Sequence, residues 1–226
     1  MPEMLAFDDR GSLDEALATQ VASWLEQGIA ERGSGYLVVS GGSTPKPLFS
    51  LLSRKTIDWR RVVIMLADER WVPADHDDRN EQMVRSTLLQ GPAAEADFLS
   101  LIPTPDDSIA NVAGLSTLLG SLPTFDVVLL GMGEDAHTAS LFPCASEIKE
   151  GLSTREGALM TCPKHAPHKR ISLSKHRLQN TRHGVVHIVG EQKKRVYEAA
   201  CRSGDERLFP VCAFSVLPAF DCWWAA

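Results

Sequence analysis

The chain has 226 residues, of which 44% are hydrophobic and 23% are charged, and its formal net charge is −6. These proportions are ordinary for a globular protein with a substantial core, and the acidic balance argues against a general nucleic-acid-binding protein. The five cysteines lack C-x-x-C spacing, as is typical of reduced thiols, and no apolar stretch approaches the length of a membrane span. We therefore expect a cytoplasmic protein without nucleic-acid or membrane partners.

The first half of the sequence predicts helices that alternate with buried strands. Ser12-Leu-Asp-Glu15 matches a capping box, which predicts that Ser12 begins the first helix. Thr44 is expected to cap a second helix that begins at Pro45. Continuous aliphatic runs are typical of parallel strands buried on both faces. The predicted strands are 36–40, 62–67 and 125–130, and the predicted helices are 12–30, 45 onward, 80–89 and 108–119.

The second half is less regular but continues the same alternation. Arg170–Ser174 and Gly184–Val189 are predicted strands, a helix is expected to open at Gly190-Glu-Gln-Lys193, and apolar Phe214–Trp224 is expected to supply a last strand. Strands alternating with helices predict an α/β fold with a doubly wound, mainly parallel sheet. We expect a single domain over residues 1–226, as a monomer or a weak homodimer.

Three polar loops follow the predicted strands directly, at the edge where open α/β sheets bind ligands. The first is Ser40-Gly-Gly-Ser-Thr-Pro45. Gly41 and Gly42 allow the backbone to approach a ligand, and the Ser43 and Thr44 hydroxyls near a helix start predict an anion cradle. A tight turn is the alternative. The loop matches neither a Walker motif nor G-x-G-x-x-G, so no nucleotide cofactor is implied.

The second loop, Asp68-Glu69-Arg70, places three charges in a row after a buried strand. Adjacent charges at such a place need solvent or ionic partners. A salt-bridged strand end is one interpretation, and a ligand site to which Asp68 and Arg70 contribute is the other.

The third loop, Gly131-Met-Gly-Glu-Asp-Ala-His137, carries the candidate general base. A histidine side chain suits proton transfer near neutral pH, and Asp135 is near enough in sequence to orient His137. A surface histidine in a polar turn is the alternative. The other six histidines are expected to be structural or solvated, and no metal site is predicted because ligand spacing is absent. No G-x-S-x-G elbow is present, so a serine nucleophile is not expected.

Arg170 and Lys193 are the candidate cations of the second half. Arg170 begins a predicted strand, and Lys193 lies in the first turn of a predicted helix, where the helix dipole disfavours a cation. That misfit suggests that Lys193 serves a ligand, whereas each of the two residues taken alone is more typical of solvated surface.

Several motifs in order resemble the 6-phosphogluconolactonases. They are V-S-G-G-S-T-P, A-D-E-R-W-V-P, the D-D-R-N-E loop, L-L-G-M-G-E-D-x-H-T-A-S-L-F-P, R-I-S-L-S and G-x-x-K, from about residue 36 to 195. The resemblance implies a sugar-phosphate isomerase/deaminase-like α/β fold and cofactor-free hydrolysis of a phosphorylated sugar lactone in the pentose phosphate pathway. His137 would activate water. Gly131 and Gly133 amides or Arg70 would stabilise the oxyanion, and Ser43, Thr44, Arg170 and Lys193 would hold the phosphate.

The chain departs from the family pattern at Ala136, where the family usually has glycine. If that position needs a positive φ, alanine costs about 1 kcal/mol or more. The related glucosamine-6-phosphate deaminases carry a glutamate where this chain has Phe142, and a phenyl ring cannot relay protons. This difference favours the lactonase over the deaminase. A sugar-phosphate-sensing domain is a third possibility, but the chain has no DNA-binding extension.

Overall fold

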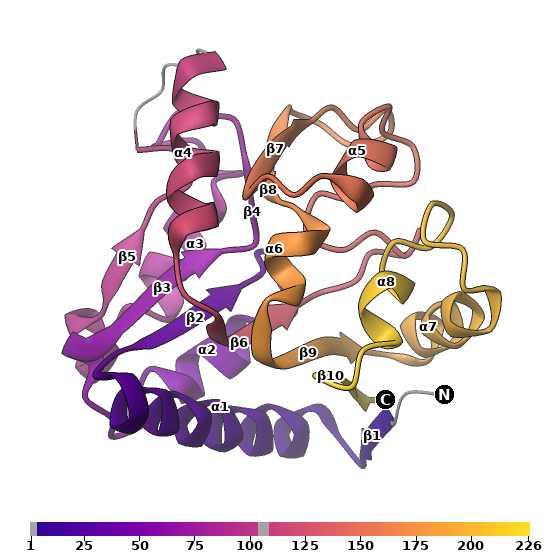
Figure 1. The fold of residues 1–226 in the computed structure, drawn as a ribbon. Helices are drawn as coiled ribbons and strands as arrows, with labels where there is room; N and C mark the ends of the chain where they lie inside the picture. Colours follow the sequence, from indigo (N-terminus) through magenta and orange to yellow (C-terminus); the bar gives the residue numbers. More distant parts are fainter. Residues whose placement is uncertain (1–3, 104–108) are drawn as a thin grey trace.

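The computed structural model describes residues 4–103 and 109–226 (Figure 1). Its central sheet confirms the predicted doubly wound α/β fold, because all of its strand pairs are parallel. In spatial order the strands are β1 (Met4–Phe7), β10 (Phe220–Ala225), β9 (Thr181–Val189), β6 (Phe125–Leu130), β2 (Gly35–Val39), β3 (Val62–Leu66) and β5 (Asp97–Leu99).

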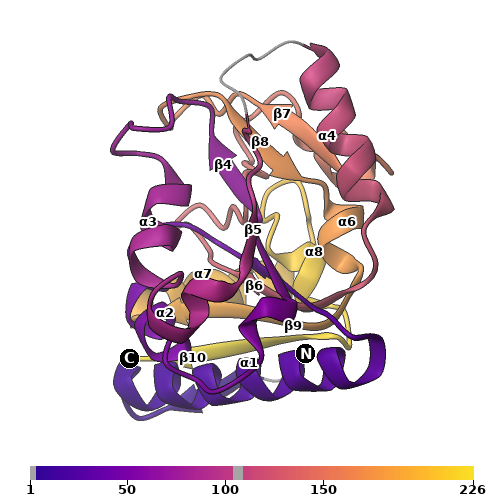
Figure 2. The same ribbon diagram turned by 90° about the vertical axis from the view of Figure 1, so that its left-hand side faces the viewer.

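A second, antiparallel sheet of three strands stands above the central sheet (Figure 2). Its strands are β4 (Asp68–Arg70), β8 (Arg170–Leu173) and β7 (Ala158–Thr161). Ala67 joins the two sheets, since its N–H donates to Val39 of the central sheet and its carbonyl accepts from Leu173 of the second sheet. The strand predicted over 62–67 therefore ends at this junction, and the following charges belong to a strand of their own.

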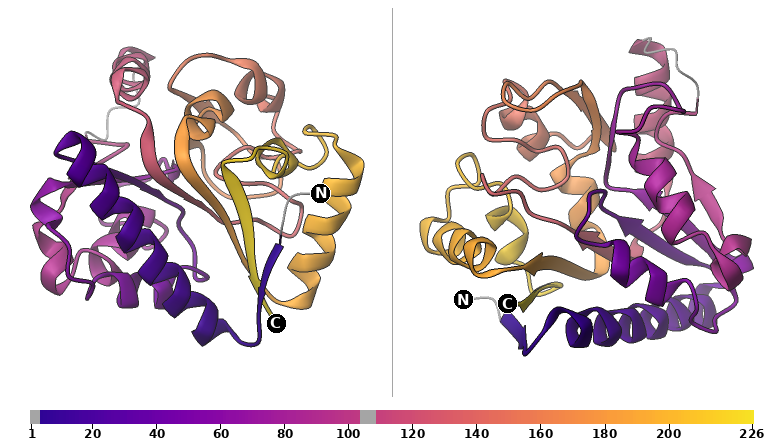
Figure 3. Two further views of the ribbon diagram at one scale, coloured as in Figure 1. Left: turned by 60° about the horizontal axis from the view of Figure 1, so that its bottom comes forward. Right: turned by 180° about the vertical axis from the view of Figure 1, so that it is seen from behind.

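Helices cover both faces of the central sheet. Helix α1 runs beneath the sheet in Figure 1, while α6 and α8 lie above it, and Figure 3 shows the same layers from below and behind. The helices are α1 (Arg10–Arg32), α2 (Lys46–Leu52), α3 (Asn80–Thr87), α4 (Ile109–Ser121), α5 (Ile148–Ser153), α6 (Lys175–Gln179), α7 (Glu191–Ser203) and α8 (Cys212–Ser215). Short 3₁₀ helices span Trp59–Arg61 and Gly91–Glu95.

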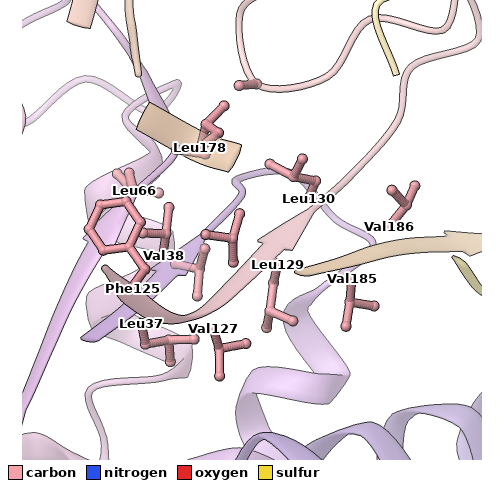
Figure 4. Close-up of a cluster of buried hydrophobic side chains, with 14 of the residues drawn as sticks. Leu37, Val38, Leu66, Phe125, Val127, Leu129, Leu130, Leu178, Val185 and Val186 are labelled. Carbon is pink, nitrogen blue, oxygen red and sulfur yellow. The ribbon is translucent and has the colours of Figure 1, made fainter. Parts of the chain in front are cut away.

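The core is built on the middle strands of the central sheet (Figure 4). Aliphatic side chains of β2, β6 and β9, such as Val38, Val127 and Val185, are fully buried. Every residue of β6 is buried, as expected for a strand covered on both faces. This packing holds the carboxyl ends of the strands in fixed positions, where the polar loops begin.

Two predicted helix caps are wrong. Helix α1 begins at Arg10, because the extended residue Asp9 accepts the backbone N–H and the hydroxyl of Ser12 at 2.9 and 2.8 Å. An ionised Asp9 caps the helix one turn earlier than the predicted box, and its pKa is lowered by the hydrogen bonds from Ser12. Helix α2 has Pro45 at its N-cap and no side-chain cap, so Thr44 does not have the predicted role.

Other predicted boundaries differ less. Residues 212–215 form α8 rather than a strand, and the last strand begins only at Phe220, after the turn that contains Pro218. The predicted strand at Arg170 is present but belongs to the second sheet. The predicted start of a helix at Ser108 lies outside the described residues, and α4 is described from Ile109.

Candidate active site

The three predicted loops meet at one pocket beyond the carboxyl ends of β2 and β6, with a volume of about 280 Å³. This is the position that the parallel sheet predicts for a ligand site. The pocket is lined by eleven of the twelve predicted site residues, namely Gly41, Gly42, Ser43, Thr44, Asp68, Arg70, Gly131, Gly133, His137, Arg170 and Lys193. The twelfth, Asp135, contacts His137.

His137 and Asp135 form a hydrogen-bonded pair at the pocket wall. The Nδ1 atom of His137 lies 2.5 Å from Oδ1 of Asp135, which also accepts the backbone N–H of His137 at 3.2 Å. Burial alone would raise the pKa of the Asp135 carboxyl, but the hydrogen bonds and charge of His137 lower it overall. An ionised Asp135 can only accept in this hydrogen bond, so Nδ1 of His137 carries the hydrogen and donates it, and in that neutral tautomer Nε2 is the proton acceptor.

The ring of His137 is also held by stacking and by its own loop. It stacks on Phe142 with ring centroids 3.9 Å apart and an interplanar angle of 24°. A Cβ atom at Gly133 would lie 2.2 Å from Nδ1 and Cε1 of His137, so only glycine fits there. Ala136 has φ of 62°, which shows that the residue before His137 does occupy the left-handed region.

The backbone amides of this loop are already engaged within the protein. Gly131 donates its N–H to Oγ of Ser40 at 3.1 Å, and Gly133 donates to the carbonyl of His137 at 2.9 Å. The two N–H groups that the resemblance implied for the oxyanion therefore have internal partners. Arg70, the other group implied for that role, is the better candidate.

The three charges of the second loop point to different sides because β4 is a strand, in which successive side chains alternate. Glu69 is fully buried and accepts three backbone N–H groups, from Arg70, Asn80 and Glu81, at 2.7–2.9 Å. Its carboxylate also lies 3.3 Å from Nε of Arg79. Burial raises the pKa of the Glu69 carboxyl despite these partners. Glu69 thus supports the loop from behind.

Asp68 and Arg70 line the pocket instead. Asp68 is 5% exposed and accepts a hydrogen bond from Oγ of Ser140, whose backbone N–H donates to Oγ of Ser172 at 3.2 Å. Asp135 is therefore the carboxylate that holds the His137 ring, whereas Asp68 is fixed by Ser140.

Arg70 and Arg170 are direct neighbours across β4 and β8. Arg70 donates to the backbone carbonyl of Asp78 at 2.6 Å, and Arg170 lies 3.9 Å from Asp68 and over the ring of Phe142. Burial lowers the pKa of Arg170. The buried Nε atoms of both arginines have no hydrogen-bond partner in the described structure. Two such guanidinium groups make this wall of the pocket strongly attractive to an anion.

Lys193 reaches the pocket from the first turn of α7, as predicted. Its ammonium group donates to the carbonyl of Met132, and burial lowers the pKa of Lys193 although Glu134 and Asp135 act in the opposite direction. A half-buried cation at the start of a helix is unfavourable on its own, which supports a role in ligand binding.

The first loop approaches the pocket through its backbone. Gly42 has φ of 95°, and a Cβ atom at Gly41 would lie 2.1 Å from the side chain of Asn80. The carbonyl of Thr44 accepts a hydrogen bond of 2.7 Å from Arg10. Asn80 itself lines the pocket and donates to the carbonyl of Asp68 at 3.3 Å.

Asn80 and His187 line the pocket although neither is among the predicted site residues, and Ser140 contributes indirectly through its hydrogen bond to Asp68. Asn80 occurs in the D-D-R-N-E motif, which is a signal that could have found it, whereas His187 lies inside an aliphatic strand and gives none.

Among the remaining histidines, His76 and His168 lie beside Asp78, with the possible ligand atoms of the three residues within 4.8 Å of one another. This cluster was not predicted from spacing; Nε2 of His168 lies 2.9 Å from Asp78.

Comparison with known proteins agrees with this geometry. The sequence profile described as glucosamine-6-phosphate isomerases/6-phosphogluconolactonase matches residues 8–220. The chain belongs to this family. It is 41% identical over 213 residues to the 6-phosphogluconolactonase of Rhizobium meliloti, covering 93% of this chain and 92% of that protein. It is 40% identical to the corresponding protein of Pseudomonas aeruginosa, covering 92% and 89%.

The fold is also shared with a solved structure of this family. The crystal structure of a 6-phosphogluconolactonase from Shewanella baltica superposes with a TM-score of 0.96 at 44% identity, covering 100% of this chain and 98% of that one. The resemblance to the family and the predicted fold are thereby confirmed. In the described residues, no helix is long and apolar enough to cross a membrane.

Proposed function

We propose that this protein hydrolyses 6-phospho-D-glucono-1,5-lactone to 6-phospho-D-gluconate in the oxidative pentose phosphate pathway, with His137 as the general base. The observation that carries the proposal is the His137–Asp135 pair, 2.5 Å apart, on a pocket that also presents Arg70, Arg170 and Lys193. A base beside several cations suits the attack of water on an ester of an anionic substrate. The family membership and the lactonase relatives support the same activity.

The reaction follows from the positions of these groups. His137 takes a proton from water through Nε2, and the water oxygen forms a bond to the lactone carbonyl carbon. The resulting negative charge on the carbonyl oxygen is stabilised by Arg70. When the bond from that carbon to the ring oxygen breaks, His137 returns its proton to the ring oxygen, and the open-chain carboxylic acid loses its proton to solvent. Asp135 keeps the imidazole oriented throughout both transfers.

The phosphate group is assigned to the cationic and hydroxyl-bearing part of the pocket. Ser43 and Thr44 supply hydroxyl groups and Gly41–Gly42 a closely approaching backbone, while Arg170 and Lys193 supply charge. No metal or organic cofactor has a role in this mechanism.

Loss of a phosphate-binding cation should change binding more than chemistry. We expect Lys193→Ala and Arg170→Ala to raise KM for the phosphorylated lactone by about tenfold or more, because a hydrogen bond to a charged group contributes roughly 1.5–3 kcal/mol. Their kcat values should change less, and the wild type should discriminate strongly against unphosphorylated gluconolactone. Steady-state kinetics on both lactones would check this. Equal hydrolysis of the two lactones by the wild type would show that the phosphate assignment is wrong.

A specific contact argues against the deaminase. Phe142 stacks on His137 where the deaminases carry a glutamate, and a phenyl ring can neither accept nor donate a proton. Release of ammonia from glucosamine 6-phosphate would contradict this interpretation. Ligand-dependent stabilisation without turnover would instead support a sugar-phosphate sensor.

We further propose that residues 1–226 act as one domain in the cytoplasm, as a monomer or a weak homodimer, without a nucleic-acid partner.

A further inference from the structure

A second histidine, His187, lines the same pocket as His137 but comes from the central sheet. It lies near the end of β9, between strands β10 and β6, and is 4% exposed. Its Nε2 atom is 3.2 Å from Oδ1 of Asp14, a residue of α1 that is 1% exposed. The mechanism above uses neither residue.

The pair is buried but poorly satisfied. Neither Oδ1 of Asp14 nor Nε2 of His187 has an aligned hydrogen bond to a described residue, although the two atoms face each other. Incomplete hydrogen bonding of buried polar groups destabilises a folded protein, and most buried polar atoms avoid it. His187 lines the pocket whereas Asp14 does not, and Nε2 of His187 faces Asp14. The ring of His187 is therefore the polar group of this pair that a bound ligand can reach.

Arg10 connects this pair to the first loop. Its Nε atom lies 3.4 Å from Oδ2 of Asp14, and its Nη2 atom donates to the carbonyl of Thr44 at 2.7 Å. Asp14 therefore contacts the pocket histidine with one oxygen and, through Arg10, supports the Ser43–Thr44 loop with the other. A displacement of Asp14 would disturb both the strand side and the loop side of the pocket.

We propose that His187 is a further binding residue of this pocket, whose imidazole ring forms a hydrogen bond to an oxygen of the bound sugar phosphate. Asp14 and Arg10 are positioning residues that hold His187 and the Ser43–Thr44 loop together as one binding surface. The proposal rests on the proposed function, since it names a new contact for the same substrate. It assigns His187 to affinity rather than to the chemical step.

The test compares ligand binding by His187→Leu, His187→Gln and the wild type. Isothermal titration with 6-phosphogluconate should show a Kd raised about fivefold to tenfold in His187→Leu, the effect of one lost hydrogen bond. In His187→Gln the rise should be smaller, because an amide can still donate and accept. The kcat for the lactone should change less than KM in both variants.

Measurements with inorganic phosphate and with unphosphorylated gluconate show which oxygen of the ligand His187 contacts. If His187→Leu weakens inhibition by inorganic phosphate, the ring contacts the phosphate group. If it weakens binding of 6-phosphogluconate and gluconate but not of phosphate, the ring contacts a sugar oxygen. Either result supports the proposal.

His183→Leu is the matched control. His183 lies on the same strand and stacks on Trp24 with ring centroids 4.4 Å apart, but it is not among the residues that line the pocket. Its replacement should lower the thermal unfolding temperature without changing Kd. If His187→Leu fails to fold, the Kd of the Arg10→Met variant for 6-phosphogluconate tests the inference instead. This variant should fold, because the Arg10 side chain is 40% exposed and its loss removes only the link between Asp14 and Thr44.

A folded His187→Leu variant that binds 6-phosphogluconate as tightly as the wild type would overturn the inference alone, and so would an equally tight Arg10→Met variant if His187→Leu does not fold. A wild type that neither hydrolyses the lactone nor binds 6-phosphogluconate would instead refute the proposed function, and the inference with it.

Discussion

At the scale of single residues, the orientation of His137 is the property on which the proposed chemistry depends. Asp135 fixes one ring nitrogen at 2.5 Å, and Phe142 fixes the ring plane by stacking at 3.9 Å. A histidine so constrained reaches a reacting water without first losing rotational freedom. The sequence could predict the Asp135 contact because the two residues share one loop, but it suggested Phe142 only as a missing glutamate.

Ala136 is a residue in a strained backbone conformation. Its φ of 62° costs roughly 1–2 kcal/mol for an L-residue with a Cβ atom, whereas glycine avoids that cost but loses more chain entropy and a buried methyl group. We expect Ala136→Gly to be as stable as the wild type or more stable by up to about 0.5 kcal/mol, as measured by urea unfolding.

The exposed helical residue Ala113 provides the comparison for this substitution. Ala113 lies within the helix α4, where alanine is favoured over glycine. Ala113→Gly should therefore lower the free energy of unfolding by about 1 kcal/mol. An equal loss in Ala136→Gly would show that the left-handed conformation is not strained.

At the scale of elements, β4 shows why local sequence alone is an incomplete guide to the second loop. The three consecutive charges directly follow a buried parallel strand in the sequence, but they form a strand of their own in the second sheet. Strand alternation sends Asp68 and Arg70 to the pocket and Glu69 to Arg79 on the other side. The antiparallel partner, β8, follows about 100 residues later, so local sequence could not reveal the pairing.

The third loop provides a sharp steric test. A Cβ atom at Gly133 would lie 2.2 Å from the His137 ring, while a Cβ atom at Gly131 meets its nearest neighbour, Cβ of Ser40, only at 3.9 Å. We expect Gly133→Ala to displace the ring and lower kcat by at least about a hundredfold, the scale of a lost general base. Gly131→Ala should retain most of the activity.

Lactone kinetics on both folded variants check this pair. Near-wild-type turnover by Gly133→Ala would mean that the orientation of His137 in the loop does not control catalysis.

The end of α4 depends on one buried arginine of α6. Arg177 donates to the carbonyls of Leu119, Leu122 and Pro123 and lies over the ring of Phe125, 3.5 Å from its centroid. Burial lowers the pKa of Arg177 to about 10. These bonds satisfy carbonyl groups at the end of a helix, where no backbone partner remains.

Removal of this guanidinium should destabilise the protein without touching the pocket. We expect Arg177→Leu to lower the free energy of unfolding by about 2–3 kcal/mol, since several carbonyls lose a charged donor. The exposed Arg207→Leu should change it by less than about 0.5 kcal/mol. Urea unfolding monitored by circular dichroism measures both values, and equal stabilities for the two variants would contradict the assigned role.

At the scale of the whole molecule, the sequence predicted the sheet type and the convergence of the loops because both follow from local patterns. Aliphatic runs mark the buried parallel strands, and polar residues behind them mark the ligand edge. The short strands β1, β5 and β7 were missed because three or four residues carry too little periodicity. Asp14 and His187 are 173 positions apart and meet only through the packing of α1 against the sheet, which no motif encodes.

The central claim is that His137 activates water for hydrolysis of 6-phosphogluconolactone. The most direct measurement follows the decay of freshly generated lactone with no protein, with wild type, with His137→Ala and with His176→Ala, which removes an exposed histidine of α6. We expect wild type and His176→Ala to accelerate decay equally, and His137→Ala to lower kcat by about a hundredfold to ten-thousandfold with little change in KM. Undiminished turnover by His137→Ala would show that another group is the base, and no acceleration by the wild type would contradict the proposed activity itself.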